Sequence, residues 1–291
     1  MFRGAITALI TPFSNGKIDE RVFQSLIERQ LHEGIHGLVP CGTTGECATL
    51  SHTEHNRAIE LCIEAVAGRV PVIAGTGSNS TTEAVEMSVH AEKSGADAVL
   101  VVTPYYNKPT QEGMYQHFKA INDAIGIPVI LYNVPGRSVV DLSNETIARL
   151  AELKNIKGIK DATGDLERPS RLRMLVGHEF MQFSGDDGTA LAFNAQGGIG
   201  CISVTANLTP HLCAKLQDLW RNGSHSEALA IHDSLMPLHS VMFCESNPTP
   251  VKYAASLLGL CEATVRLPLV QPTADNKQRI KRTLEALQLV T

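Results

Sequence analysis

The feature of this sequence that most restricts its fold is a regular alternation between short apolar runs and longer amphipathic stretches. The runs have the length of buried strands, and the stretches between them repeat their apolar residues with helical periodicity. The eight runs occupy residues 5–12, 37–41, 71–75, 98–103, 128–134, 156–161, 180–184 and 199–204. Strands that alternate with helices pair in parallel through right-handed crossovers. Eight such units close a barrel, so the alternation predicts an α/β fold, a (β/α)8 TIM barrel.

An open, doubly wound sheet is the main alternative fold for such an alternation. That fold carries a G-x-G-x-x-G turn after its first strand and divides into two nucleotide-binding halves, and neither feature occurs here. The alternation stops after residue 223, and helical periodicity alone continues at residues 226–243, 250–260 and 275–289. We therefore expect a catalytic barrel over residues 1–223 and a C-terminal helical subdomain over residues 224–291.

Two helix starts can be placed from the sequence. A helical pattern begins near Asp19, and the apolar residues that follow it recur on one face. Ser51 is followed three residues later by Glu54, which is the spacing of a capping box. We expect a helix to follow each of these positions.

Composition and charge exclude several classes of function. The net charge is −5, so no basic surface for nucleic acid or an anionic membrane is expected. No segment approaches the roughly 20 apolar residues that span a bilayer. The 7 cysteines form no C-x-x-C pair, and the sequence therefore predicts reduced thiols and a cytoplasmic protein.

Unusual polar residues follow several of the predicted strands. They include Thr43 and Thr44 after the second strand, Tyr105 and Tyr106 after the fourth, Tyr132 and Arg137 around the end of the fifth, Lys160 on the sixth and Gly185 after the seventh. In a barrel of this kind the carboxyl ends of the strands surround the active site. We therefore expect these residues to converge on one cavity.

Lys160 is the residue that points most directly to a chemistry. Strand parity places it on the same side as Ile156 and Gly158, and loss of water there favours the free amine over the ammonium. A free amine attacks a ketone and forms an imine, which acts as an electron sink. The alternative is a lysine at a strand end whose ammonium reaches solvent.

An imine-forming lysine needs groups that move protons. Tyr132 and Tyr106 could relay protons with the Thr44 hydroxyl between them, and Arg137 could pair with a substrate carboxylate. The alternatives are tyrosines packed for stability, threonines that cap a turn and a solvated loop arginine.

Histidines raise the question of a metal. His52 and His55 are three residues apart on a predicted helix, but no third ligand has a suitable spacing, so no metal is expected. His225, His232 and His239 recur every seven residues and are interpreted as a partly exposed helix face.

Taken together, the motifs resemble the dihydrodipicolinate synthase branch of the N-acetylneuraminate lyase superfamily. The resemblance rests on CGTTGE at 41–46, VTPYYN at 102–107, YNVPGR at 132–137, GIKDATG at 158–164 and NPTPVKYA at 247–254. It implies condensation of pyruvate with aspartate semialdehyde to give 4-hydroxy-tetrahydrodipicolinate in lysine biosynthesis, without a cofactor.

The resemblance also implies roles for individual residues. Lys160 would form the imine, and Tyr132, Thr44 and Tyr106 would form the proton relay, with Tyr106 supplied by a neighbouring subunit of a homotetramer built as a dimer of dimers. Thr43, Thr44 and Arg137 would bind the substrates, with Thr43 and Arg137 holding their carboxylates. Gly185 and Ile202 would line the pocket with backbone atoms.

A regulatory site is implied in the same way. The positions of a lysine feedback site map to Ala48, His52, His55, Asn79, Glu83 and Tyr105. The chain departs from the family at Cys47, where serine is usual, and at Asp161, where glutamate is common.

Three other functions stay open on the sequence alone. The first is an aldolase for N-acetylneuraminate or 2-keto-3-deoxy sugar acids that uses the same lysine imine. The second is a pyridoxal-phosphate enzyme whose lysine holds the cofactor. The third is a non-catalytic relative that binds pyruvate or lysine.

Overall fold

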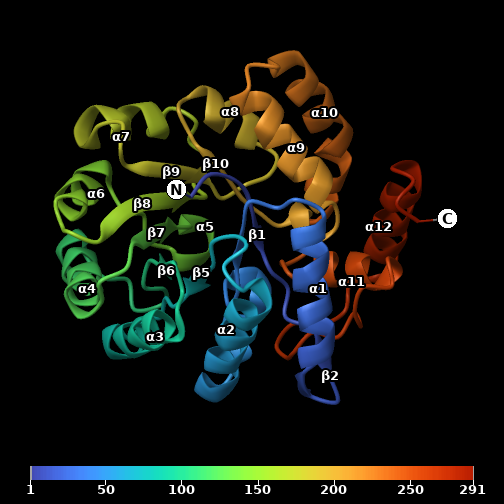
Figure 1. The fold of residues 1–291 in the computed structure, drawn as a ribbon, viewed down its shortest axis with the longest axis horizontal. Coiled ribbons are helices and arrows are strands. Elements are labelled where there is room, and N and C mark those ends of the chain that lie inside the picture. Colours follow the sequence, from blue (N-terminus) through green and yellow to red (C-terminus); the bar gives the residue numbers. More distant parts are fainter. Residues whose placement is uncertain (1, 291) are drawn as a thin grey trace.

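The computed structural model describes residues 2–290, and its centre is a closed ring of parallel strands surrounded by helices (Figure 1). Eight strands lie in the order β4-β1-β10-β9-β8-β7-β6-β5, and a parallel bridge between Leu38 and Val72 joins the two ends. The strands are β1 (Gly4–Ala8), β4 (Gly37–Val39), β5 (Ile73–Gly75), β6 (Ala98–Val102), β7 (Val129–Asn133), β8 (Ile156–Asp161), β9 (Met181–Ser184) and β10 (Gly200–Ser203). The predicted barrel is confirmed.

Helices connect successive strands and cover the outside of the ring (Figure 1). They are α1 (Glu20–His32), α2 (His52–Val66), α3 (Thr81–Ser94), α4 (Gln111–Ala124), α5 (Pro135–Ser138), α6 (Asn144–Ala151), α7 (Arg168–Val176), α8 (Ala190–Ala195) and α9 (Pro210–Arg221). The Asp19 side chain accepts a hydrogen bond from the Val22 amide, and Ser51 and Glu54 form the expected capping box. Both predicted helix starts are confirmed.

The remaining elements lie beyond the barrel or between its units. Three more helices follow the last βα unit: α10 (His225–Val241), α11 (Thr249–Leu257) and α12 (Ala274–Ala286). Through residue 290 this part of the chain contains helices and no strand, as its periodicity predicted. Single 3-10 turns are η1 (Thr43–Gly45), η2 (Cys47–Thr49) and η3 (Thr205–Asn207).

Several short or weakly periodic elements were not anticipated from the sequence. A small antiparallel hairpin of β2 (Phe13–Ser14) and β3 (Lys17–Ile18) precedes α1. The helix α7 was also missed, because its sequence RPSRLRMLV carries three arginines and gives a weak apolar periodicity. Its buried side chains include Leu172, which packs in the core, and Arg168, which forms ion pairs with Asp141 and Asp161.

The core has an inner and an outer part. Side chains such as Ile6, Val39, Ile130, Phe183 and Ile202 fill the barrel, and a larger cluster packs between the strands and the helices. Where β8 meets β9, the space is narrow: a Cβ atom on Gly158 would lie 2.6 Å from the Met181 carbonyl oxygen. A glycine is required there for the strands to approach.

The predicted orientation of Ile156 was wrong. Ile156 packs in the outer cluster, together with Val129 opposite it, whereas Ile130 lies in the barrel and pairs with Gly158. The register between β7 and β8 shifts between Val129 and Ile130, so one extra residue reverses the sides of the strand. Lys160 is therefore on the inner side, but Ile156 is not.

The histidine-rich face of α10 is partly exposed, as expected. His225 is exposed, whereas His239 is buried and its Nδ1 atom lies 2.8 Å from the Thr205 hydroxyl, so this end of the face packs on the barrel. No helix within residues 2–290 combines the length and apolar character that crossing a membrane requires.

Candidate active site

Lys160 and Tyr132 lie side by side at the carboxyl ends of two neighbouring strands. Lys160 is on β8 and Tyr132 on β7, and the two residues are direct partners in the register of this parallel pair. The Lys160 Nζ atom lies 4.2 Å from the centroid of the Tyr132 ring. Both side chains are buried. The structure thus places the amine against one of the expected proton-transfer groups.

The strand end that carries Lys160 is held by contacts of the next residue. Burial raises the pKa of the Asp161 carboxyl, whereas hydrogen bonds from the Thr163 hydroxyl and amide, at 2.6 and 2.8 Å, act in the opposite direction. Arg168 Nε lies 3.2 Å from the Asp161 carboxylate. Since neighbouring residues in a strand point to opposite faces, these contacts hold β8 from outside while Lys160 faces the barrel interior.

Thr43 and Thr44 lie on η1, the turn that follows β4. Thr44 is buried, and its Oγ1 atom accepts a hydrogen bond of 3.0 Å from Asn247 Nδ2. Because an amide donor occupies a lone pair of Oγ1, the hydroxyl hydrogen of Thr44 stays available to donate to another group. The contact fixes the position of the hydroxyl oxygen.

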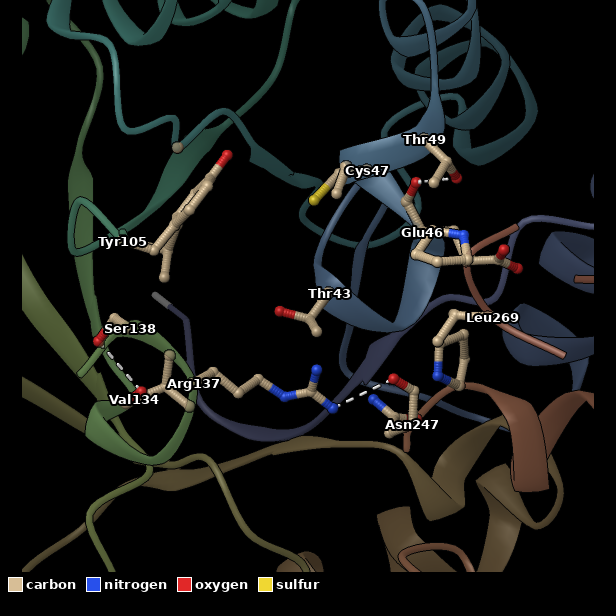
Figure 2. Close-up of a pocket in the computed structure, with 15 residues that line it drawn as sticks. Thr43, Glu46, Cys47, Thr49, Tyr105, Val134, Arg137, Ser138, Asn247 and Leu269 are labelled. Carbon is tan, nitrogen blue, oxygen red and sulfur yellow. Dashed lines mark hydrogen bonds between the residues drawn. The ribbon is translucent and has the colours of Figure 1, made fainter. Parts of the chain in front are cut away.

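A cavity of about 300 Å³ opens beside this turn, with Thr43 on one wall and Arg137 on another (Figure 2). Arg137 comes from α5, and its Nη2 atom donates to the Asn247 carbonyl oxygen at 3.1 Å. Lys160, Tyr132 and Thr44 are not among the residues that line the cavity. All three side chains are buried, and Tyr132 belongs to the same inner cluster as Val134, which forms part of the cavity wall.

Asn247 is a site residue that the sequence analysis missed. Its side chain contacts Thr44 and its carbonyl contacts Arg137, so one residue joins two expected functional groups. It comes from the C-terminal part of the chain, just before α11. In the sequence this residue begins the segment NPTPVKYA, which contributes to the resemblance. The Asn-Pro pair at its start is the only local signal that marks Asn247.

Gly185 and Ile202 lie at the ends of neighbouring strands β9 and β10. The Gly185 amide donates to the Asp161 carbonyl at 2.6 Å, and a Cβ atom on Gly185 would lie 2.7 Å from Ala162 Cβ. Ile202 packs inside the barrel in the same cluster as Tyr132. Gly185 therefore lies beside the strand end that carries Lys160, and Ile202 lies in the barrel interior.

Tyr106 does not join the other relay residues within one chain. Its side chain is 89% exposed, and its backbone is in the left-handed region with φ of 73°. The neighbouring Tyr105 lines the cavity instead. The three-membered relay expected from the resemblance is thus incomplete in a single chain.

The residues of the expected lysine site are only partly gathered. Ala48 and Tyr105 line the cavity, and His52 lies 3.7 Å from the Glu83 carboxylate. The Asn79 carbonyl accepts a hydrogen bond of 2.8 Å from Asn107. These groups are close to the surface of the chain.

His55 differs from the other residues of that set. It is buried, and its Nε2 atom lies 2.8 Å from the Gly75 carbonyl oxygen. Burial lowers the pKa of His55, while the contact with Gly75 acts in the opposite direction.

Within residues 2–290, no three His, Cys, Asp or Glu side chains are grouped as a metal site would require.

Comparison with known proteins places this geometry in a family. Residues 1–287 match the model of the Dihydrodipicolinate synthetase family. A 4-hydroxy-tetrahydrodipicolinate synthase of Rhodospirillum centenum is 60% identical over 291 residues, which cover 100% of both chains.

Solved structures agree with the match. A chloride-inhibited dihydrodipicolinate synthase of Acinetobacter baumannii complexed with pyruvate has a TM-score of 0.97 and 44% identity over 100% of both chains. A dihydrodipicolinate synthase of Cyanidioschyzon merolae with lysine bound has a TM-score of 0.96 and 38% identity over 99% of both chains. The chain described here belongs to the dihydrodipicolinate synthetase family.

Proposed function

We propose that this chain condenses pyruvate with L-aspartate 4-semialdehyde to give 4-hydroxy-tetrahydrodipicolinate, in the diaminopimelate route of lysine biosynthesis. The observation that carries the proposal is the buried amine of Lys160, 4.2 Å from the Tyr132 ring, in a chain of this family. Relatives with the corresponding names support the substrates.

The chemistry begins at Lys160. Its amine attacks the keto carbon of pyruvate, water leaves, and the resulting imine withdraws electrons from the adjacent methyl group. Loss of a methyl proton gives an enamine, whose carbon attacks the aldehyde of the second substrate. The aldehyde oxygen gains a proton. The amino group of that substrate then attacks the imine carbon and releases Lys160.

Each of these steps moves a proton, and we assign its transfer to two side chains. Tyr132 adjoins Lys160, and Thr44 is oriented by Asn247 with its hydrogen free to donate. General acid–base groups of this kind accelerate a reaction by about 10² to 10⁴-fold. We propose that the Tyr106 hydroxyl of a neighbouring subunit completes the path, because the side chain is exposed in its own chain.

Carboxylate groups of both substrates need partners. We assign the pyruvate carboxylate to Thr43 and the η1 turn, and the carboxylate of the semialdehyde to Arg137 at the cavity wall. A guanidinium presents two parallel donors to a carboxylate. Gly185 and Ile202 supply backbone surface at the ends of β9 and β10.

We further propose a lysine site formed by Ala48, His52, His55, Asn79, Glu83 and Tyr105, in a homotetramer assembled as a dimer of dimers. The lysine-bound relative supports it. The Glu83 carboxylate suits the ammonium of lysine, and burial of His55 limits this residue to a supporting role.

All seven cysteines of the chain are free thiols, in keeping with a cytoplasmic location.

The substrate assignment is tested by supplying the purified protein with pyruvate and L-aspartate 4-semialdehyde and measuring product formation. Parallel reactions offer N-acetylneuraminate and 2-keto-3-deoxygluconate for cleavage. We expect turnover of the semialdehyde in preference to both sugar acids. Efficient cleavage of either sugar acid, with no condensation, would contradict the proposal and favour the sugar-acid aldolase.

A further inference from the structure

A completely buried ion pair lies next to the catalytic turn. Lys252 Nζ, from α11, donates to Glu46 Oε1 at 2.6 Å, and both side chains are 0% exposed. Buried ion pairs are weak devices for stability, because apolar side chains of similar size often stabilise a fold equally well. Its position beside the turn that carries Thr44 therefore points to a role in the reaction.

Both oxygens of the Glu46 carboxylate are held by the C-terminal part of the chain. Oε1 accepts from Lys252, and Oε2 accepts from the Arg266 amide at 2.9 Å. Arg266 also donates to the Thr49 carbonyl at 2.9 Å. The Lys252 ammonium and the Arg266 guanidinium lie 4.1 and 4.3 Å from the centroid of the Phe13 ring. The carboxylate is thus fixed from several directions.

The backbone of Glu46 ends the turn that carries Thr44. Glu46 is in the left-handed region, with φ of 55° and ψ of 35°, and its amide donates to the Thr43 carbonyl at 3.1 Å. A residue with a side chain keeps this conformation only where its surroundings impose it. Figure 2 shows the Glu46 carboxylate pointing away from Thr43, toward the segment that carries Leu269. The C-terminal part of the chain therefore holds the Glu46 side chain, while the Glu46 backbone is bonded to the turn.

The same C-terminal segment contacts the turn a second time. Asn247, five residues before Lys252, donates to the Thr44 hydroxyl. From the N-terminal part of the chain, Thr11 donates to the Gly45 carbonyl at 2.7 Å. The hydroxyl of Thr44 and the carboxylate of Glu46 are consequently fixed by one continuous stretch of chain. A shift of α11 would move both.

We propose that Glu46 and Lys252 are positioning residues for the reaction. Their buried ion pair fixes the turn Thr43–Gly45, so that the Thr44 hydroxyl stays in place in the proton relay with Tyr132, and it makes α11 part of the catalytic apparatus. The inference rests on the proposed function. It concerns two residues to which that function assigns no part.

Two variants separate positioning from stability. In the double variant Glu46→Gln with Lys252→Met no unpaired charge is left in the interior, and the Gln carbonyl can still accept from the Arg266 amide. In the single variant Glu46→Gln, Lys252 stays without its partner. Burial lowers the pKa of Lys252, so this amine can become neutral there.

The measurement is exchange of the pyruvate methyl protons in deuterated water, together with kcat and KM and with borohydride trapping of the pyruvate imine. We expect the imine on Lys160 to form in both variants, whereas exchange and kcat/KM fall by about 100-fold, the cost of a displaced catalytic group. Leu284→Ala is the matched control, because Leu284 is fully buried in α12 and lies outside the turn. At a similar loss of Tm it should keep its exchange rate.

Three results would overturn the role of the pair. They are unchanged exchange in folded variants, an equal loss of exchange in Leu284→Ala at the same Tm, and unfolding of both variants, which would assign the pair to stability alone. The parent chain separates this inference from the proposed function. A parent without a pyruvate adduct contradicts the function, whereas a parent with an adduct and variants with unchanged exchange contradict only the role of the pair.

Discussion

At Thr44, one hydrogen bond determines the direction in which a hydroxyl can act. Asn247 Nδ2 donates to Oγ1 at 3.0 Å, and the Thr44 hydrogen is therefore left for a different partner. The side chain is buried on the turn Thr43–Gly45, so the group has little freedom to reorient. A threonine in this setting is suited to pass a proton.

Replacement of Thr44 by Val tests that interpretation, since valine has nearly the same shape and no hydroxyl. We expect kcat to fall by about 10² to 10⁴-fold, the contribution of a general acid–base group. Imine formation on Lys160 with pyruvate should persist. Steady-state kinetics and trapping of the imine check the two parts, and a variant with parental kcat would exclude Thr44 from the relay.

The sequence could point to most residues of the candidate site but not to their contacts. Lys160 and Tyr132 stand at the ends of apolar runs that the periodicity reveals, and a barrel topology brings such ends together. Asn247 and Lys252 lie about 200 residues from the turn they hold, and no local pattern encodes a contact of that range. For that reason both were missed.

At the scale of an element, Glu54 both caps the start of α2 and binds the C-terminal segment. Glu54 completes the capping box with Ser51 and also pairs with Arg266 at 2.5 Å. The hydrogen bond from Arg266 is the main cause that lowers the pKa of Glu54 to about 2, against the opposing effect of burial. The start of α2 is thereby joined to the C-terminal segment.

This pairing predicts a pH dependence of stability. Because the pKa of Glu54 in the folded chain lies below its ordinary value of 4.5, the stabilisation is complete above pH 4.5 and is lost as the pH falls toward about 2. The side chain is 28% exposed, so solvent screening limits the effect. We expect Glu54→Gln to cost about 1 kcal/mol of unfolding free energy at pH 7.

Denaturant unfolding of the parent and of Glu54→Gln between pH 7 and about pH 3 measures this difference. The gap between the two proteins should narrow as the pH falls below the ordinary value. A gap that stays constant over this range would show that Arg266 does not stabilise the ionised carboxylate.

Elements with strong periodicity were predicted well, and those with weak periodicity were not. The sixth apolar run and β8 share the same bounds, Ile156–Asp161, whereas α7 was overlooked because arginines interrupt its apolar face. The wrong side assigned to Ile156 has a different cause. A register shift opposite Val129 is a property of two paired strands, and a single strand read alone cannot reveal it.

At the scale of the whole molecule, the exposed position of Tyr106 is the main departure from a site formed by one chain. The side chain is 89% exposed, and Tyr105 occupies the cavity wall. A large aromatic side chain in such a position is suited to an interface between subunits. Contacts between chains leave no trace in the periodicity of one chain, and only the resemblance suggested this role.

Mixing subunits tests whether Tyr106 acts across a boundary. We expect Tyr106→Phe and Lys160→Ala chains to be nearly inactive separately, and their hybrids to recover part of the parental rate. Recovery follows because some sites then combine an intact Lys160 with a partner's intact tyrosine. Hybrids no more active than the separate variants would contradict the shared site.

The central claim is that Lys160 forms an imine with pyruvate, and trapping tests it most directly. The protein is incubated with pyruvate and borohydride, its intact mass is measured, and the modified peptide is mapped. We predict a single reduced pyruvate adduct on Lys160, absent from a folded Lys160→Ala variant. A folded parent chain that acquires no adduct, or an adduct on another lysine, would contradict the account.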